Sequence, residues 1–211
     1  MKKILFFLLF AAFLWNGCGR KTILRKYYVI EIPVPADSII LDKPPLTEKT
    51  CEILPVSVAS PFANERIALR RQTHEITYYL NHRWAVKPDE VITQQIERHL
   101  QQQRIFSLAT SRFWKLIPDY QLKTEIYQLE AVEENGKLTA HLHIDFSLVD
   151  THSRKVVIYF SANRFEPLPK KNMNLFADAL SNLLSRELHT LSQKMTLYFQ
   201  NSRENQPAEK P

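Results

Sequence analysis

The clearest pattern in the chain is an unbroken alternation of apolar and polar residues in its second half. The apolar members are Leu138, Ala140, Leu142, Ile144, Phe146 and Leu148, and the polar members are Lys137, Thr139, His141, His143, Asp145 and Ser147. Alternation with a period of two places each set on one face of a β-strand, so one face should be buried and the other solvated.

Neighbouring segments extend this strand into a sheet. Residues 120–126 alternate in the same way, and a third strand is predicted over 156–164. Asn135 and Gly136 separate the first two strands. This dipeptide is typical of type I′ hairpin turns, whose two central residues take positive φ. Residues 119–165 are therefore predicted to form a three-stranded meander with one solvated face.

Four shorter apolar segments predict further strands in the first half of the chain. They span residues 27–32, 52–58, 66–70 and 75–79. The connector 33–47 is rich in proline, which removes backbone donors and fixes φ. This connector should therefore be extended and irregular.

Two segments have apolar residues at the three- and four-residue spacing of helices. The first begins at Pro88, a favoured first helical residue. Its apolar stripe consists of Val91, Ile92, Ile96 and Leu100. The second spans residues 172–199, which is about 42 Å at 1.5 Å per residue, long enough to project beyond a small sheet. The predicted fold class is α/β (α+β), a mostly antiparallel or mixed sheet with helices packed on one face.

The start of the chain has the layout of a secretory signal peptide. Lys2 and Lys3 precede an uninterrupted apolar run over 4–15, and Gly17 and Cys18 follow it. A membrane span needs about 20 apolar residues, so this run is too short to be one. We expect the chain to be exported and the leader to be cleaved.

Cys18 makes this leader resemble that of a bacterial lipoprotein. Residues 14–18 are similar to the lipobox, in which cleavage before the cysteine, here between Gly17 and Cys18, accompanies acylation of that cysteine. Several acyl chains on one residue anchor firmly. Trp15 departs from the aliphatic residue usual at its position. The alternative is an ordinary leader cleaved near Gly17 with an incidental cysteine.

The net charge and the cysteine content restrict the partners and the disulfides that this chain is expected to have. The whole chain carries a net charge of +6, and the mature chain would carry about +4. Several cations fall in the tether 18–26, where they would lie against lipid headgroups. No basic stripe with interleaved aromatic residues follows, so a nucleic-acid partner is not expected. Cys51 alone would remain unmodified, which leaves no intramolecular disulfide, and it is expected to be a small buried hydrophobe.

His141, His143 and Asp145 are the one candidate metal site, because alternate residues of a strand point the same way. The favoured interpretation is a solvated strand face, since no other His or Cys has a recognisable partner spacing. The remaining histidines are expected in polar surroundings, at a turn, a loop or a helix surface, and none is expected to be catalytic; they are His74, His82, His99, His152 and His189. With no Gly-rich phosphate loop and no Gly-x-Ser-x-Gly elbow, neither a cofactor nor an enzymatic activity is expected.

Trp84 and Trp114 remain as large aromatic candidates. Such residues are usually core anchors. The alternative is that either one forms part of a partner interface.

The order of these segments resembles the ABC-type transport auxiliary lipoprotein family, which includes the paraquat-inducible protein C type. The matching residues are Tyr27 and Tyr28, 53–58, Arg70 and Arg71, 75–79, Arg83 to Ala85, Pro88, 118–122, and 176–183 with the helix that follows. The chain is accordingly divided into a lipoprotein signal peptide (1–17), a lipidated tether (18–26), an auxiliary lipoprotein domain (27–200) and a disordered tail (201–211).

The resemblance implies a periplasmic domain tethered to a membrane. It would work beside an MCE-domain protein and an ABC transporter permease and ATPase that move lipids between the two membranes of a Gram-negative envelope. Gly19 after the cysteine favours sorting to the outer membrane. The leading hypothesis is a non-enzymatic accessory subunit that docks on this complex. The alternatives are a carrier that binds phospholipid in an apolar pocket between sheet and long helix, and an envelope hydrolase. Oligomeric state stays open.

Overall fold

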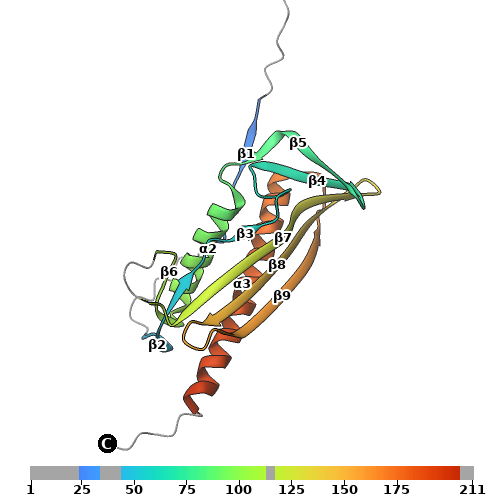
Figure 1. The fold of residues 1–211 in the computed structure, drawn as a ribbon. Coiled ribbons are helices and arrows are strands. Elements are labelled where there is room, and N and C mark those ends of the chain that lie inside the picture. The colour runs from blue at the N-terminus through green and yellow to red at the C-terminus, as the bar shows by residue number, and fades with distance from the viewer. Residues whose placement is uncertain (1–23, 34–43, 113–116, 205–211) are drawn as a thin grey trace, which may run out of the picture.

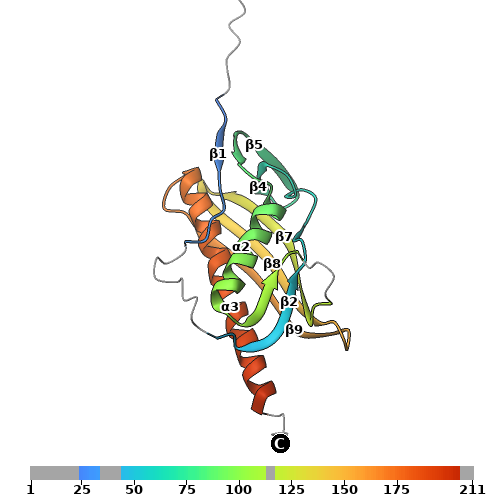
Figure 2. The same cartoon turned by 90° about the vertical axis from the view of Figure 1, so that its left-hand side faces the viewer.

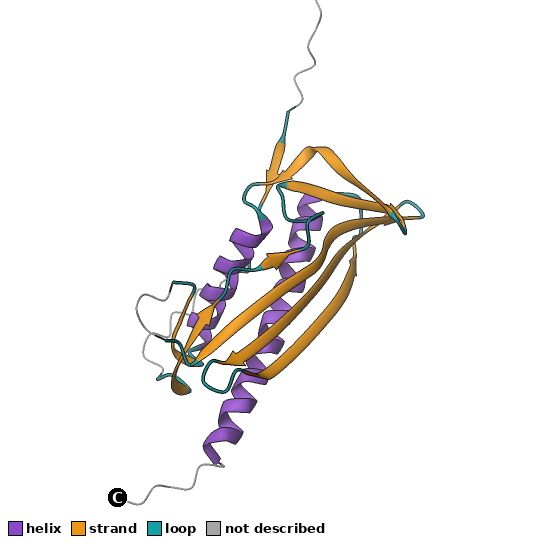
Figure 3. Cartoon of the chain, in the orientation of Figure 1, coloured by secondary structure: helices purple, strands orange, loops and turns teal. Residues whose placement is uncertain are grey.

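The computed structural model describes residues 24–33, 44–112 and 117–204, which form a nine-stranded mixed sheet with two helices (Figures 1 and 3). The strands are β1 (Lys26–Tyr28), β2 (Thr47–Ile53), β3 (Ser57–Val58), β4 (Arg66–Gln72), β5 (Glu75–Trp84), β6 (Phe106–Thr110), β7 (Tyr120–Glu134), β8 (Lys137–Asp150) and β9 (Lys155–Pro167). The helices are α2 (Pro88–Gln103) and α3 (Met173–Glu204). The predicted α+β class with a mixed sheet and a long C-terminal helix is confirmed.

Strand β7 is the centre of the sheet. It pairs antiparallel with β8, which pairs antiparallel with β9, so the predicted meander is confirmed. On its other edge β7 pairs in parallel with β2, β3 and β4. β4 then pairs with β5, β5 with β1, and β2 with β6. The meander thus forms one half of the sheet and the short strands form the other.

The hairpin between β7 and β8 turns at Asn135 and Gly136, as predicted. Their φ angles are 48° and 76°, both in the left-handed region that type I′ turns require. Glu134 and Lys137 face each other across the turn and close the ladder.

Replacing Gly136 with alanine is expected to lower the free energy of unfolding by about 1 kcal/mol, because a Cβ is disfavoured at positive φ. Apart from its chain neighbours, no described atom lies within 4 Å of the position that this Cβ would take, so the loss would report backbone strain alone. Gly136→Asn should lose less, since asparagine tolerates this region better. Equal urea midpoints for the two variants and the parent would contradict the prediction.

Both helices cover the same face of the sheet (Figure 2). The predicted stripe of α2 is buried in full: Val91, Ile92, Ile96 and Leu100. Pro88 stands at its first turn, as the sequence indicates. Neither of the helices in the described part of the chain is long and apolar enough to cross a membrane.

Helix α3 begins at a side-chain cap. The Asn172 carboxamide oxygen accepts hydrogen bonds from the backbone N–H groups of Asn174, at 2.8 Å, and Leu175, at 3.4 Å. The helix runs to Glu204, so it continues four residues into the segment 201–211 that the sequence predicts as a disordered tail. Its last turns extend past the end of the sheet (Figure 1), as its length predicts.

Two predicted strands have other bounds than expected, and β2 begins at Thr47, five residues before the predicted start. The segment 52–58 is divided into β2 and β3, and Pro55, which has no N–H to donate, lies in the break. The segment 27–32 pairs only as far as Tyr28. Beyond it, the N–H of Glu31 donates to Ser181 Oγ at 3.1 Å and the N–H of Ile32 donates to Gln95 Oε1 at 3.2 Å. Side chains of the two helices therefore replace a neighbouring strand.

Cys51 and Trp84 both lie in the core. Cys51 is fully buried, as expected of a small hydrophobe, and burial raises the pKa of its thiol to about 12. Trp84 is 2% exposed and stacks on Phe176 with ring centroids 5.9 Å apart. Trp84 is thus a core anchor and offers no surface to a partner, while Trp114 lies outside the described residues.

Candidate functional site

The face of β7, β8 and β9 that points away from the helices carries the candidate site, and we call it the outer sheet face. A β-bulge in β7 shapes it: Ile126 pairs with Ile144, but the next paired residue, Gln128, faces His143. The extra residue, Tyr127, shifts the alternation by one position. Glu130, which would otherwise point into the core, is therefore placed on the outer sheet face.

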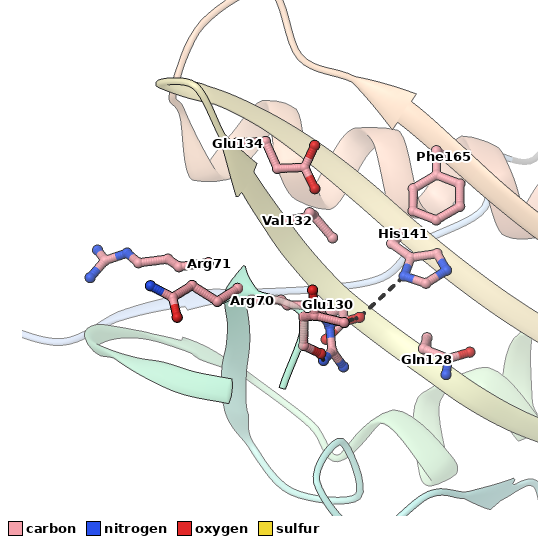
Figure 4. A pocket seen from close by; sticks show the side chains of 10 residues that line it. Arg70, Arg71, Gln128, Glu130, Val132, Glu134, His141 and Phe165 are labelled. Carbon is pink, nitrogen blue, oxygen red and sulfur yellow. Dashed lines mark hydrogen bonds and ion pairs between the residues drawn. The ribbon is translucent and has the colours of Figure 1, made fainter. Parts of the chain in front are cut away.

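Glu130 is the buried centre of this face (Figure 4). Its side chain is fully buried, and its Oε1 accepts hydrogen bonds from Arg70 Nε at 2.8 Å and from His141 Nδ1 at 3.1 Å. His141 Nε2 lies 2.8 Å from Asn163 Oδ1. The His141 ring stacks on Phe165, with centroids 4.0 Å apart. Side chains from β4, β7, β8 and β9 thus form one connected network.

The Glu130 carboxyl is charged in this buried place. Burial acts to raise its pKa, but the hydrogen bonds from His141 and Arg70 outweigh burial and hold the pKa below the ordinary value of 4.5. A buried carboxylate stays charged only when hydrogen bonds and an opposite charge offset the loss of water. The stability of this network therefore depends on both Arg70 and His141.

A second network lies further along β8. Asp145 Oδ2 accepts a hydrogen bond from the Tyr159 hydroxyl at 2.7 Å, and its Oδ1 lies 3.8 Å from His143 Nε2. His143 Nδ1 lies 2.7 Å from Gln128 Oε1, and its ring is 5.0 Å from that of Tyr127. The bulge therefore places two β7 side chains beside one β8 imidazole.

The three candidate metal ligands do not converge. His141 turns one nitrogen to Glu130 and the other to Asn163, while His143 turns its Nδ1 to Gln128. Within the described ranges, no group of three His, Cys, Asp or Glu side chains is arranged to hold a metal ion.

The prediction that this strand face is solvated is wrong for two of its residues. His141 and Asp145 are each only 8% exposed. Side chains of the flanking strands cover them, since Phe165 stacks on His141 and Tyr159 reaches over to Asp145. The alternation of apolar and polar residues in one strand predicts the face on which each residue lies. It does not predict whether side chains of adjacent strands will cover that residue.

Each network leaves one buried carboxylate oxygen without a hydrogen bond. These atoms are Glu130 Oε2 and Asp145 Oδ1. Within the described part of the chain neither has a hydrogen-bond partner, although Asp145 Oδ1 lies 3.8 Å from His143 Nε2. Buried acceptors are normally paired. A hollow of about 370 Å³ opens beside the first network, between Arg70, Arg71, Glu134 and Phe165 (Figure 4). Both oxygens have almost no accessible surface, so this face offers another molecule the hollow and the exposed side chains around it rather than these two atoms.

Exposed aromatic side chains surround the two networks. Tyr159 is 62% exposed, Phe165 is 56% exposed and Tyr127 is 39% exposed. Aromatic residues are enriched at the centres of protein interfaces. Fixed polar groups ringed by exposed aromatics are chemically suited to recognition, whereas His141 has neither ring nitrogen free for proton transfer.

The remaining site residues predicted from the sequence fall elsewhere. Gly17, Cys18 and Trp114 lie outside the described residues. His99 was expected on a helix surface, and this expectation is wrong: it is 8% exposed, and its Nε2 lies 2.9 Å from Ser192 Oγ. The packing of α3 onto α2 buries it.

Several residues of the outer sheet face are absent from the sequence-based candidates: Arg70, Tyr127, Glu130, Tyr159, Asn163 and Phe165. One signal of them is present in the sequence. The apolar positions of β7 change from even numbers, ending at Ile126, to odd numbers, beginning at Leu129. Such a change of phase inside a strand indicates a bulge.

Comparison with known proteins gives the family. Residues 30–191 match the profile of the ABC-type transport auxiliary lipoprotein component family. A solved protein from Xanthomonas campestris, assigned to the family DUF330, is 16% identical with a TM-score of 0.70 over 85% of this chain and 100% of its own. A second, uncharacterized protein is 12% identical with a TM-score of 0.65 over 82% of this chain and 99% of its own.

At these identities the two structures establish the fold alone. No curated protein sequence matches the chain significantly. The family profile, however, spans most of the chain, and lipoproteins of this family are auxiliary components of ABC-type transport, which indicates a membrane-anchored place in the cell envelope. The chain belongs to the ABC-type transport auxiliary lipoprotein component family.

Proposed function

We propose that this protein is a non-enzymatic adaptor subunit of an MCE/ABC-type intermembrane lipid transport system. Acylated Cys18 would anchor it on the periplasmic side of the outer membrane, and the outer sheet face would dock on the MCE-domain protein of the transport complex. The observation that carries the proposal is the cluster of exposed aromatic side chains on one face, around two hydrogen-bonded polar networks and beside a hollow of about 370 Å³.

The chemistry of this face defines the partner surface it would take. The hollow is lined by the charged side chains of Arg70, Arg71 and Glu134, with which polar or charged side chains of the partner would pair. Tyr159 and Phe165 would lose exposed apolar area in the same contact. Two independent kinds of contact therefore favour protein docking on this face.

The alternatives receive less support from the geometry. A phospholipid carrier needs an apolar cavity between the sheet and α3, but the side chains at that contact are fully buried and packed together: Phe146, Leu183, Leu188, Leu191 and Met195. An envelope hydrolase needs a free base, and both nitrogens of His141 are engaged by side chains. These observations favour the adaptor.

Replacing Tyr159 and Phe165 together with serine is expected to reduce co-purification of the MCE-domain protein about tenfold, because exposed aromatics at an interface centre contribute more than 1 kcal/mol each. The measurement is affinity purification of the tagged full-length lipoprotein from native envelopes, followed by quantification of the MCE-domain protein, permease and ATPase. Leu197→Ser is the matched control, since Leu197 is 59% exposed on α3 and lies off the outer sheet face.

Equal recovery of the transport proteins with both variants would refute docking through this face. Native mass spectrometry of the purified lipoprotein adds a second outcome. A retained phospholipid without any MCE partner would favour the carrier and would contradict the adaptor.

A further inference from the structure

Strand β1 lies beside β5 at the end of the molecule opposite the C-terminus of α3 (Figure 1), and several apolar residues of this region are exposed. Leu24 is 76% exposed, Leu80 is 79% exposed, Tyr27 is 56% exposed and Val29 is 49% exposed. Lys26 pairs with His82, so the same parallel register continued by two residues brings Leu24 beside Leu80. Leu24 and Leu80 lie on one face of this strand pair, and Tyr27 and Val29 alternate to the other face. Both faces are therefore apolar and exposed at this end of the pair, and we call this end, with its four side chains, the β1–β5 surface.

The charged residues in the two segments that form the β1–β5 surface are basic, and three exposed glutamates border these segments: Glu31, Glu65 beside Trp84, and Glu90, which pairs with Lys87 at 4.0 Å. Residues 24–30 and 76–87 contain Arg25, Lys26, Arg83 and Lys87 and no Asp or Glu. Arg25, Lys26 and Lys87 are exposed. Basic residues beside exposed leucine and tyrosine are the composition of segments that lie in a membrane interface.

Helix α3 fixes which end of the molecule this surface occupies. Near the start of the helix, Phe176 stacks on Trp84 of β5 and Ser181 accepts a hydrogen bond from Glu31, just beyond β1. Near its other end, Phe199 packs against Phe106 and Tyr120. The β1–β5 surface therefore lies at the start of a helix about 48 Å long.

The length of the tether adds a geometric limit. Leu24 follows Cys18 by six residues. Six residues span at most about 22 Å when fully extended. An acyl anchor at Cys18 would thus hold Leu24 close to the lipid surface, while the far end of α3 could stand well away from it.

We infer that the β1–β5 surface rests on an anionic lipid surface and directs α3 away from the membrane. The inference deepens the proposed function and rests on its acyl anchor at Cys18. Leucine and tyrosine side chains enter the headgroup region, and the arginine and lysine side chains contact lipid phosphates. The domain then has one orientation on its membrane, which presents the outer sheet face to the transport complex at a set height.

The experiment places one environment-sensitive fluorophore on the full-length lipoprotein, at Leu80→Cys or, as the matched control, at Leu197→Cys. Both leucines are exposed, at 79% and 59%, and they lie at opposite ends of the molecule. Cys51 is fully buried, with a thiol pKa raised to about 12, so it leaves the introduced cysteine as the reactive one. Labelled protein is reconstituted into phosphatidylethanolamine–phosphatidylglycerol vesicles that carry a nitroxide quencher at the headgroup.

The probe at position 80 is expected to be quenched about threefold more than the probe at 197, because only the first enters the interface. Replacing phosphatidylglycerol with phosphatidylcholine is expected to reduce this difference, and a difference that stays unchanged would overturn the anionic-lipid assignment. Flotation of the same vesicles separates the two proposals. Protein that floats with equal quenching at both positions overturns the β1–β5 contact alone, whereas protein that does not float overturns the anchor and this contact with it.

Discussion

Replacing Glu130 with alanine is expected to lower the free energy of unfolding by about 3 kcal/mol, because breaking a buried ion pair leaves its partner uncompensated. The Glu130 side chain is fully buried, while those of Arg70 and His141 are 25% and 10% exposed. Both donors would lose their shared acceptor, and His141 has little access to water as a replacement. Partial exposure of Arg70 keeps the expected loss at the lower end for such pairs.

The measurement is urea unfolding of the parent and the variant at neutral pH. Glu133→Ala is the matched control: its carboxylate lies on the same strand and pairs with Arg71 and Lys171, but these partners are more than half exposed. Exposed pairs contribute less than about 1 kcal/mol. If both variants lose the same stability, Glu130 is not the centre of the network.

Acid should reduce the difference in stability between the parent and Glu130→Ala. Because the folded-state pKa of Glu130 is below its ordinary value of 4.5, its carboxylate stabilises the fold fully above that value. This contribution is lost as the pH falls through the lowered pKa, where the folded state must also take up the proton.

Because His99 is buried in its neutral form, the free energy of unfolding is expected to fall by about 3 kcal/mol as the pH decreases from 6.5 to 4. Burial, together with the nearby charge of His189, lowers its pKa from 6.5 to about 4, against a hydrogen bond with the Leu188 backbone that acts to raise it. Between these two values the unfolded chain binds a proton that the folded chain excludes. Stability is therefore complete above pH 6.5 and decreases in acid.

Urea unfolding between pH 4 and 8 tests this with His99→Leu, which cannot take up the proton. The variant should be less stable at neutral pH, because Ser192 loses its partner, but its stability should change little between pH 6.5 and 4. His152→Gln is the control, since His152 is exposed in the β8–β9 turn and should leave the acid loss intact. An unchanged acid loss in His99→Leu would assign the proton to another group.

The regular elements of the fold could be read from the sequence because each has a local cause. The β7–β8 hairpin needs positive φ at Asn135 and Gly136, and α2 needs a first-turn proline and an apolar stripe. The break between β2 and β3 was missed although Pro55 marks it. The end of β1 could not be predicted, because side chains of α2 and α3 distant in sequence take over the backbone donors after Tyr28.

The candidate site was predictable only in part. His141, His143 and Asp145 were identified as neighbours on one face, which follows from the period of a strand. Their partners were not, because Glu130 reaches this face through the bulge and Arg70 arrives from a strand about 60 residues earlier. The alternation within one strand predicts which face of the sheet a residue lies on. It does not predict which residues of the neighbouring strands lie beside it, because that depends on the pairing register.

The sequence by itself determined the antiparallel meander, the two helices and the family, and it alone predicts a leader with its cysteine, because these depend on local spacing and composition. The tertiary structure alone decided that the polar face of β8 is partly buried, that Glu130 is charged inside it and that His99 is enclosed between helices. Burial and pairing are set by side chains that meet from distant parts of the chain. The energies of these buried polar contacts depend on the exclusion of water where the side chains come together, and a local sequence pattern carries no information about that exclusion.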